Sequence, residues 1–364
     1  MNKTLKTAMI GLRHGHMGKI GPEPSGYIGT FRQLQGVEIV AYCEDTDPSQ
    51  LETAAQFHPG TRTYSSVDTL IAEEDFDLAV VVLPAAQIPE VGIKLAEAGK
   101  HFYMEKQFAR RAPDLAELVR AIRRHKVKVM PGYPHRFNPL CRELKGFIDQ
   151  DLLGKPLDLE VRLITSQVRP GLRDPESFMY TDSEEGGGIL HMLGCHYLEV
   201  MRYLMGCEIK SVQAMTGRPV GHIEAPLEDL AIVGLEYQNG AYGSMHAGYL
   251  QRLRGGYDQT LIYRGLEGEA HWTPLGGPTL QIKSNDPRWN GAPERTLQAA
   301  TAPGPSGYAS TAWMFNWMQD FIHRIQTDQE PSLTAEDALR VLQSIDAMYE
   351  SAQSGRRVEV EYGD

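Results

Sequence analysis

KTAMIGLRHGHMG, residues 6–18, decides the fold class of this 364-residue chain. A short apolar run leads into a glycine-containing loop, as in the first strand of a Rossmann domain, where backbone N–H groups at a helix N-terminus face a pyrophosphate. Gly11 fits the first glycine of the fingerprint G-x-G-x-x-G, with Gly15 nearby, but Arg13 stands at the second position and His16 at the third. The Arg13 side chain would crowd a diphosphate, although its guanidinium could bind one. The loop alone therefore fits a nucleotide site and a plain strand-to-helix turn equally well.

Short apolar runs and amphipathic segments alternate through the first third of the chain. This rhythm is typical of a parallel, doubly wound sheet with crossover helices. We therefore expect a dinucleotide-binding α/β domain over residues 1–135. The predicted strands are 6–12, 37–43, 77–83, 101–107 and 126–133, and helices are predicted at 87–98 and 113–125.

The rhythm changes after residue 135, where several strands follow one another without helices between them. Asn239-Gly240 predicts a hairpin with a type I′ turn, because both residues tolerate positive φ. We expect residues 136–364 to form an α+β domain for substrate binding and oligomerisation, with a large, mainly antiparallel, open-faced sheet. Its predicted segments are helices at 139–150, 187–205, 310–327 and 335–353, a strand at 156–168, a hairpin at 260–272 and a long loop at 285–308.

Composition narrows the classes of partner. The formal net charge is −11 and the basic residues form no single stripe, so nucleic acid and anionic membranes are not expected partners. The N-terminal apolar run is too short for a signal peptide, and no stretch of about twenty apolar residues follows. The four cysteines are too far apart for a Cys-x-x-Cys site. We expect a cytoplasmic protein.

Glu44 follows the second predicted strand, in AYCEDTDP (41–48). A carboxylate at this position can accept hydrogen bonds from both ribose hydroxyls of adenosine and would repel a 2′-phosphate, which favours NAD over NADP. Alternatively, Glu44, Asp45 and Asp47 form a polar turn in which Asp47 caps the next helix.

Four segments resemble the Gfo/Idh/MocA oxidoreductase family in order and approximate spacing, from near residue 6 to near residue 360. The resemblance implies a Rossmann domain that binds nicotinamide dinucleotide and a C-terminal domain whose open sheet joins subunits into a homodimer or homotetramer. It also implies a small carbohydrate-like substrate, usually a sugar or cyclitol. The segments are AGKHFYMEKQFA (98–109), GYPHRFNP (132–139), EEGGGILHMLGCHYLEVMRYLMG (184–206) and LTAEDALRVLQSIDAMYESAQSGRRVEV (333–360).

Lys106 matches the lysine of the family's Glu-Lys-Pro motif, and His196 matches the histidine that closes its glycine-rich helix motif. The resemblance implies that both act on the substrate carbinol beside the nicotinamide. Imidazole, with a pKa near 6.5, suits the removal of the hydroxyl proton, and an ammonium stabilises the charge that develops on oxygen. Outside this motif, His196 would be a core histidine and Lys106 a surface lysine.

The chain also departs from the family pattern. Met192 stands where most members have an aspartate, and Gln107 stands where the motif has proline, so we expect a trans Lys106–Gln107 peptide. Ala85 and Ile88 replace an asparagine and a histidine. These changes point to a remodelled cofactor and substrate pocket.

The expected site residues follow from these motifs and from the carboxyl ends of the predicted strands. Tyr133 and Arg136 could equally pack at a hinge, and Arg169 could be a solvated loop charge. No metal site is expected, because His191 and His196 diverge on one helix without a completing carboxylate or thiolate. The expected catalytic residues are Lys106 and His196; the cofactor-binding residues are Gly11, Arg13, His14, Gly15, His16, Met17, Glu44, Leu83, Pro84, Glu105 and Lys106; the substrate-binding residues are Tyr133, Arg136, Arg169, His191 and Met192.

The function expected from the sequence is an NAD-dependent oxidoreductase that transfers a hydride between nicotinamide and a secondary hydroxyl of a sugar, cyclitol or related polyol. One alternative is a glycoside-cleaving enzyme that retains NAD through oxidation, elimination and re-reduction. Another is a non-catalytic protein that binds dinucleotide or sugar.

Overall fold

The computed structural model describes residues 3–168, 178–180, 186–251, 257–274, 278–289, 294–298 and 312–363. By internal contacts these divide into two compact units, residues 3–134 with 312–339 and residues 135–298 with 340–363. The contacts therefore group residues 312–339 with the N-terminal part of the chain, whereas the sequence analysis placed them after a boundary at 135. That boundary stays a prediction.

The sheet of the first unit is parallel throughout, which confirms the predicted doubly wound domain. All four residues of its β4 strand are buried, as expected for a parallel sheet covered on both faces. Predicted strand 37–43 is confirmed in full, and the others are shorter than predicted. The strand order is β3-β2-β1-β4-β5-β6, with β1 Leu5–Ile10, β2 Val37–Cys43, β3 Arg62–Tyr64, β4 Leu78–Val81, β5 His101–Met104 and β6 Val129–Pro131.

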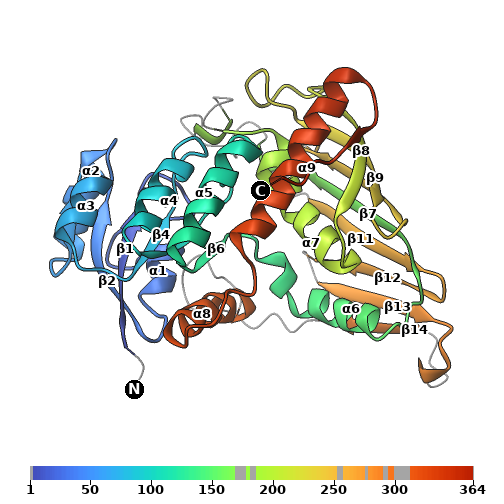
Figure 1. Cartoon of the computed structure of the whole chain (residues 1–364), viewed down its shortest axis with the longest axis horizontal. Coiled ribbons are helices and arrows are strands. Elements are labelled where there is room, and N and C mark those ends of the chain that lie inside the picture. Colours follow the sequence, from blue (N-terminus) through green and yellow to red (C-terminus); the bar gives the residue numbers. More distant parts are fainter. Residues whose placement is uncertain are drawn as a thin grey trace. The chain divides into compact units, whose positions relative to one another are not determined.

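Helices α4 and α5 pack side by side on this sheet (Figure 1). A side chain at Gly92 of α4 would collide with Leu118 of α5, so this glycine allows the two helices to approach closely. Phe102 of β5 packs beneath them as part of the core. Asp47 caps α2 by accepting a 3.1 Å hydrogen bond from the Ser49 amide, as the sequence indicated. The helices of this unit are α1 Gly26–Phe31, α2 Pro48–Phe57, α3 Val67–Glu73, α4 Ile88–Glu97, α5 Ala112–His125 and α8 Ala312–Gln326.

The first helix does not begin at the glycine loop, contrary to the sequence analysis. A turn closes between His14 and Met17, and α1 starts only at Gly26. Yet the Tyr27 amide donates to the His16 carbonyl and the Ile28 amide to the Met17 carbonyl, at 2.9 and 3.1 Å. The helical turn at residues 14–17 is thus interrupted after Met17, and helix α1 continues it from Gly26. Residues 18–25 form an excursion that returns to its own starting point.

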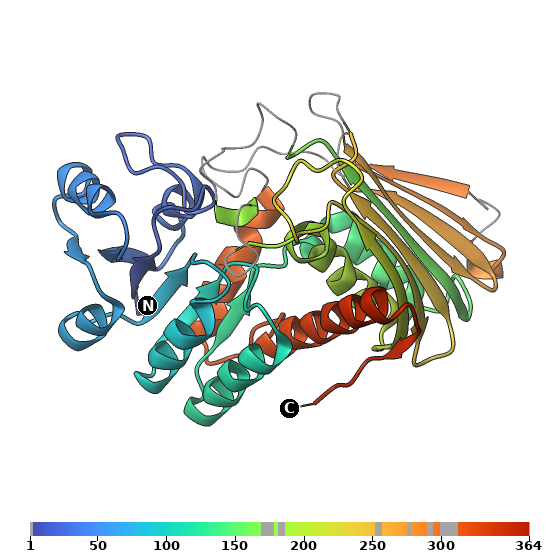
Figure 2. The same ribbon diagram turned by 90° about the horizontal axis from the view of Figure 1, so that it is seen from above.

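The second unit contains a mixed sheet in which only β7 and β10 pair in parallel among the described strands, so the expected mainly antiparallel sheet is confirmed. Figure 2 shows α6 (Pro139–Asp149) and α7 (Cys195–Met205) on one face, with the core between them and the strands. No described element of this unit covers the other face. The order is β14-β13-β12-β11-β7-β10-β9-β8-β15, with β7 Pro156–Thr165, β8 Ile209–Gly217, β9 Leu230–Tyr237, β10 Tyr242–Gly248, β11 Tyr257–Gly265, β12 Gly268–Thr273, β13 Thr279–Ser284, β14 Glu294–Gln298 and β15 Val358–Glu359.

Two local predictions in this unit were wrong. The β9–β10 hairpin is present, but only Gly240 takes a positive φ, 85°, so the turn is not type I′. The Gly240 amide donates to the Tyr237 carbonyl at 3.0 Å, as in a type I turn followed by a glycine bulge. The predicted loop 285–308 contains strand β14. The residues of this edge strand are mostly exposed and do not alternate between buried and exposed positions. The strand is formed by backbone pairing with β13, which the sequence pattern does not indicate.

Helix α9 (Ala335–Ser354) confirms the last predicted helix within one residue. In the part of the chain that the structure describes, no helix combines the length and the apolar character needed to cross a membrane.

Candidate functional site

Gly11 lies in the turn after β1, at the carboxyl edge of the parallel sheet. It has a φ of +83°, and a Cβ there would lie 2.2 Å from the Val82 carbonyl oxygen and 2.7 Å from Leu83 Cδ2. Only glycine fits, so the chain can turn tightly here against the end of β4, as at the first glycine of the Rossmann fingerprint. The residues present therefore fit a dinucleotide at this edge.

The other predicted cofactor residues of this unit follow the same strand ends. Ile10 is in register with Cys43 and Val81, and Val81 with Met104. The parallel register therefore brings one residue set to a single edge of the sheet, as expected for a ligand site in an open α/β fold. This set is Gly11, Glu44, Leu83, Pro84, Glu105 and Lys106.

Glu44 is buried, with 4% of its surface exposed. Its Oε2 accepts a 2.7 Å hydrogen bond from the Leu12 amide, and its Oε1 accepts from the Thr46 amide at 2.9 Å, the Thr46 hydroxyl at 2.6 Å and the Asp47 amide at 3.3 Å. The carboxylate thus joins the glycine loop to the loop after β2. Arg13, which is exposed, donates to the Thr46 hydroxyl at 3.2 Å.

The loop residues alternate between buried and exposed positions. His14 and Met17 are buried, Gly15 is exposed and His16 is half-buried. His14 Nδ1 accepts a 2.9 Å hydrogen bond from the His16 amide, and the two rings lie edge to face. Burial, together with the charges of His16 and Lys106, lowers the pKa of His14 to about 3. His14 is therefore neutral at physiological pH.

Glu105 sits in a buried polar cluster that sequence reasoning missed. Its Oε2 accepts hydrogen bonds from the hydroxyls of Tyr27 and Tyr103, and its Oε1 lies 3.5 Å from His16 Nδ1. Burial by itself would raise the pKa of this carboxyl, but His16, Lys106 and the Tyr27 hydroxyl outweigh it and lower the pKa to about 2. The carboxylate is therefore ionised. The sequence could have indicated Tyr103 as a partner of Glu105, because residues two apart along a strand face the same side of the sheet. It contains no local signal for Tyr27.

Lys106 is buried, with 7% of its surface exposed, and so is Gln107. The peptide bond between them is cis, so the predicted trans bond was wrong. The prediction used the general preference of non-proline peptides, which does not include the packing around two buried side chains.

In the second unit, the Glu228 side chain explains why residue 188 is a glycine. A Cβ at Gly188 would lie 1.9 Å from Glu228 Oε2. Glu228 Oε1 accepts hydrogen bonds from the Leu190 amide and the Tyr349 hydroxyl, both at 3.0 Å, and the Glu228 carbonyl accepts from the Ile189 amide. The carboxylate thus caps the helical segment that begins with a π-helical turn, Leu190–Gly194, and continues as α7.

His196 lies near the start of α7 and is buried, with 8% of its surface exposed. Its ring packs edge to face against His135, and His135 also packs against Tyr197, with ring centroids 5.4 Å apart. Burial lowers the pKa of His135 to about 4, so it is neutral at physiological pH. His135 was not among the predicted site residues, although it lies in the matched segment 132–139.

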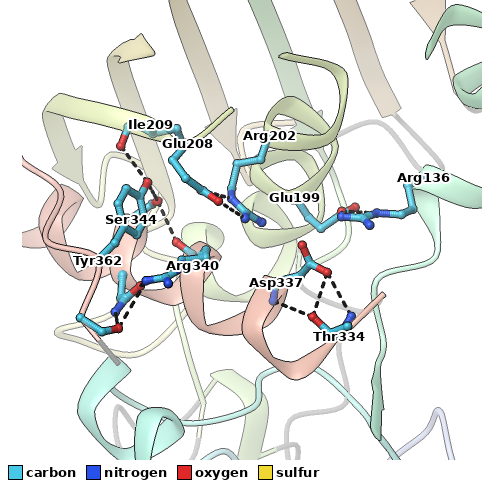
Figure 3. A network of polar contacts seen from close by, with 12 residues as sticks. Arg136, Glu199, Arg202, Glu208, Ile209, Thr334, Asp337, Arg340, Ser344 and Tyr362 are labelled. Carbon is cyan, nitrogen blue, oxygen red and sulfur yellow. Dashed lines mark hydrogen bonds and ion pairs between the residues drawn. The ribbon is translucent and has the colours of Figure 1, made fainter. Parts of the chain in front are cut away.

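The predicted substrate residues of this unit make packing contacts. His191 stacks on Tyr349 with ring centroids 5.5 Å apart, and Met192 is 4% exposed. Figure 3 shows the Arg136 guanidinium paired with the fully buried carboxylate of Glu199, at 2.5 Å from Nε to Oε1. These contacts support the packing alternative for Arg136.

Two predicted substrate residues remain. Tyr133, in the first unit, is buried edge-on against Phe108. Arg169 lies outside the described residues. Across the described ranges, no group of three His, Cys, Asp or Glu side chains could hold a metal ion.

Comparisons with known proteins cover both units. Residues 5–133 match a family described as "Oxidoreductase family, NAD-binding Rossmann fold", and residues 145–360 match "Oxidoreductase family, C-terminal alpha/beta domain". The chain is 26% identical to a D-apiose dehydrogenase from Paraburkholderia graminis, over 92% of this chain and 86% of that protein. It is 24% identical to a 2,7-anhydro-N-acetylneuraminate hydratase from Mediterraneibacter gnavus, over 92% and 95%. It shares its fold with a levoglucosan dehydrogenase solved with NADH and levoglucosan, with a TM-score of 0.82 and 23% identity over 98% of this chain and 99% of that one.

Proposed function

Since this chain belongs to the Gfo/Idh/MocA oxidoreductase family, whose N-terminal domain binds NAD, we propose that it transfers a hydride between nicotinamide and a secondary hydroxyl of a sugar, cyclitol or related polyol. The observation that carries this proposal is the match of both domains of one oxidoreductase family along nearly the whole chain, together with a D-apiose dehydrogenase relative.

The dinucleotide is held at the carboxyl edge of the parallel sheet. Gly11 permits the tight turn after β1, and the exposed Arg13 on the same loop supplies a cation for the dinucleotide. Bound NAD⁺ supplies the hydride acceptor. The remaining residues of the proposed cofactor site are His14, Gly15, His16, Met17, Leu83, Pro84 and Glu105, with Glu44 joining the glycine loop to the loop after β2.

His196 and Lys106 handle the substrate oxygen. The carbinol carbon gives up a hydride while its hydroxyl gives up a proton, which His196 accepts on its imidazole. Lys106 donates a hydrogen bond to the same oxygen and stabilises the negative charge that develops on it. Tyr133, Arg136, Arg169, His191 and Met192 stay candidate substrate residues, with the packing contacts above counting against Arg136.

The test is a spectrophotometric assay of the purified protein with NAD⁺ and a panel of polyols that includes D-apiose and levoglucosan. We expect NADH absorbance to rise with at least one polyol. A protein that neither releases NAD(H) on denaturation nor binds added NADH would contradict the proposal.

A second candidate is a reaction that retains NAD and gives no net oxidation, such as glycoside cleavage by oxidation, elimination and re-reduction. The relative named as a hydratase favours it, since hydration involves no net redox change. In the same assay, NADH absorbance would stay flat while cleaved product accumulates.

The second sheet and the thiols support a proposal for assembly and location. Met215, Ile232 and Tyr242 lie on strands of the open-faced sheet and are 66%, 42% and 60% exposed, which supports pairing of subunits into a homodimer or homotetramer through that face. The four cysteines are free, which fits a reducing compartment, and we propose the cytoplasm.

A further inference from the structure

We propose that Arg13, positioned by Thr46, is the side chain that recognises the adenosine ribose of the dinucleotide, and that it lets the protein bind NADP as well as NAD. The proposal rests on the proposed NAD site and extends it to cofactor selectivity. It reverses the usual assignment, in which the carboxylate after the second strand binds the ribose hydroxyls and excludes a 2′-phosphate.

Glu44 is already committed to the protein backbone. A carboxylate offers about four acceptor positions, two on each oxygen; Oε1 of Glu44 takes three donors, the Thr46 and Asp47 amides and the Thr46 hydroxyl, and Oε2 takes the Leu12 amide. One ribose hydroxyl could reach Oε2, but both could bind only by displacing a donor, which would then be left unsatisfied. Glu44 therefore connects two loops and is poorly placed to bind the ribose.

Arg13 offers a guanidinium group that can bind the adenosine ribose. It stands at the second glycine position of the fingerprint, is exposed, and reaches across to the loop after β2, where the Thr46 hydroxyl accepts its 3.2 Å hydrogen bond. That hydroxyl donates in turn to Glu44 Oε1, so Arg13, Thr46 and Glu44 form one chain of hydrogen bonds. In a Rossmann domain the adenosine ribose lies between these two loops.

The chemistry of guanidinium suits a phosphorylated ribose. Its planar array of N–H donors binds phosphate oxygens in bidentate fashion, whereas ribose hydroxyls can accept single hydrogen bonds from the same group. A cation in place of a bare glycine therefore adds affinity for a 2′-phosphate without preventing an unphosphorylated ribose from binding.

Acidic residues near Arg13 explain why we expect the protein to bind both NAD and NADP, and not NADP alone. Asp45 is exposed and Asp47 is half-buried in the same loop. Hydrogen bonds from Ser49 lower the pKa of Asp47, and the charge of Arg13 contributes to the shift, so the aspartate is ionised and within electrostatic reach of the guanidinium. These negative charges oppose a phosphate dianion and moderate the preference that Arg13 creates.

The test is a binding titration with NADH and with NADPH, followed by nicotinamide fluorescence, on the wild type, Arg13→Ala and Glu44→Gln. We expect wild-type dissociation constants for the two within about tenfold of each other. Arg13→Ala should weaken NADPH binding about tenfold or more and NADH binding less than about threefold. Glu44→Gln should weaken both together, because it loosens the loops. Lys19→Ala is the matched control, since it removes an exposed positive charge from the same segment and should leave the ratio unchanged.

Three results would overturn the inference: no measurable NADPH binding in a protein that binds NADH, equal losses for both dinucleotides in Arg13→Ala, or a switch to NADPH preference in Glu44→Gln with Arg13 intact. All three leave the proposed dehydrogenase standing. A wild type that binds neither dinucleotide would instead overturn the proposed function itself.

Discussion

The imidazole rings of His135 and His196 meet edge to face, with centroids 5.2 Å apart and planes at 78°. Met192, four residues before His196, cannot fix an imidazole through a charge. The ring of His135, which burial keeps neutral, packs against the His196 imidazole instead.

His196→Asn should reduce the turnover of the best polyol about 100- to 10,000-fold, the usual contribution of a general base. NADH binding should change little, because the variant alters the proton acceptor and no residue of the proposed cofactor site. Steady-state kinetics and a binding titration on the same sample measure both. His125→Gln, at an exposed histidine, is the control; equal activity of the two variants would remove His196 from the mechanism.

His14 makes stability depend on pH. Its pKa in the folded protein, about 3, lies below the ordinary value of 6.5, so the stability contributed by the neutral ring is complete above pH 6.5 and is lost as the pH falls toward 3. His14→Asn keeps an acceptor for the His16 amide but cannot titrate. Urea unfolding between pH 6.5 and 4 should therefore show a shallower loss for the variant than for the wild type, and parallel curves would contradict this origin.

Glu199→Gln should lower the free energy of unfolding by about 3–5 kcal/mol, because it leaves the Arg136 guanidinium without its buried counter-ion. The double variant Arg136→Met/Glu199→Gln should recover part of that loss. Urea titrations of the wild type, Glu199→Gln, Arg136→Met and the double variant give the coupling energy. A single variant as stable as the wild type would show that the pair is not maintained in solution.

Gly188→Ala should destabilise the protein by about 1–3 kcal/mol, because a methyl group there collides with the Glu228 carboxylate that binds the Leu190 amide. Gly60→Ala is the matched control, since a Cβ at Gly60 meets nothing within 4 Å. Thermal unfolding compares the two, and similar melting temperatures would argue against the cap.

Met215→Glu/Ile232→Glu should shift the protein to a smaller species in solution, because two charges on an apolar part of the open sheet face oppose its burial between subunits. Light scattering coupled to gel filtration measures the mass. Phe57→Glu, at an exposed aromatic residue of α2, should leave the mass unchanged. An unaltered mass in the double variant would place the interface elsewhere.

The sequence predicted the features that depend on local periodicity. Strand 37–43 and helices α4, α5, α6 and α9 lie within one or two residues of their predicted bounds, because apolar spacing and the turn residues beside it are local signals. The cluster of site residues at the sheet edge was also predictable, since the ends of parallel strands meet there.

Contacts between distant residues were not predictable from a single sequence. Glu228 caps a helix from 38 residues away, Glu199 pairs with Arg136 across 63 residues, and Tyr27 reaches Glu105 across 78. No local pattern marks such a partner, because each bond depends on how whole elements pack. For the same reason, the sequence contains no sign that Glu44 accepts hydrogen bonds from the Leu12, Thr46 and Asp47 amides.

The excursion of residues 18–25 bears on how this chain should be aligned with others. Gly18 and Gly26 touch, since a Cβ on Gly26 would lie 2.4 Å from the Gly18 Cα atom, so eight letters of sequence span almost no distance in space. Alignment with a chain that lacks such an excursion would need an eight-residue gap between Met17 and Gly26 to bring Tyr27 into register. Superposition of backbones, with this segment set aside, gives the correct correspondence.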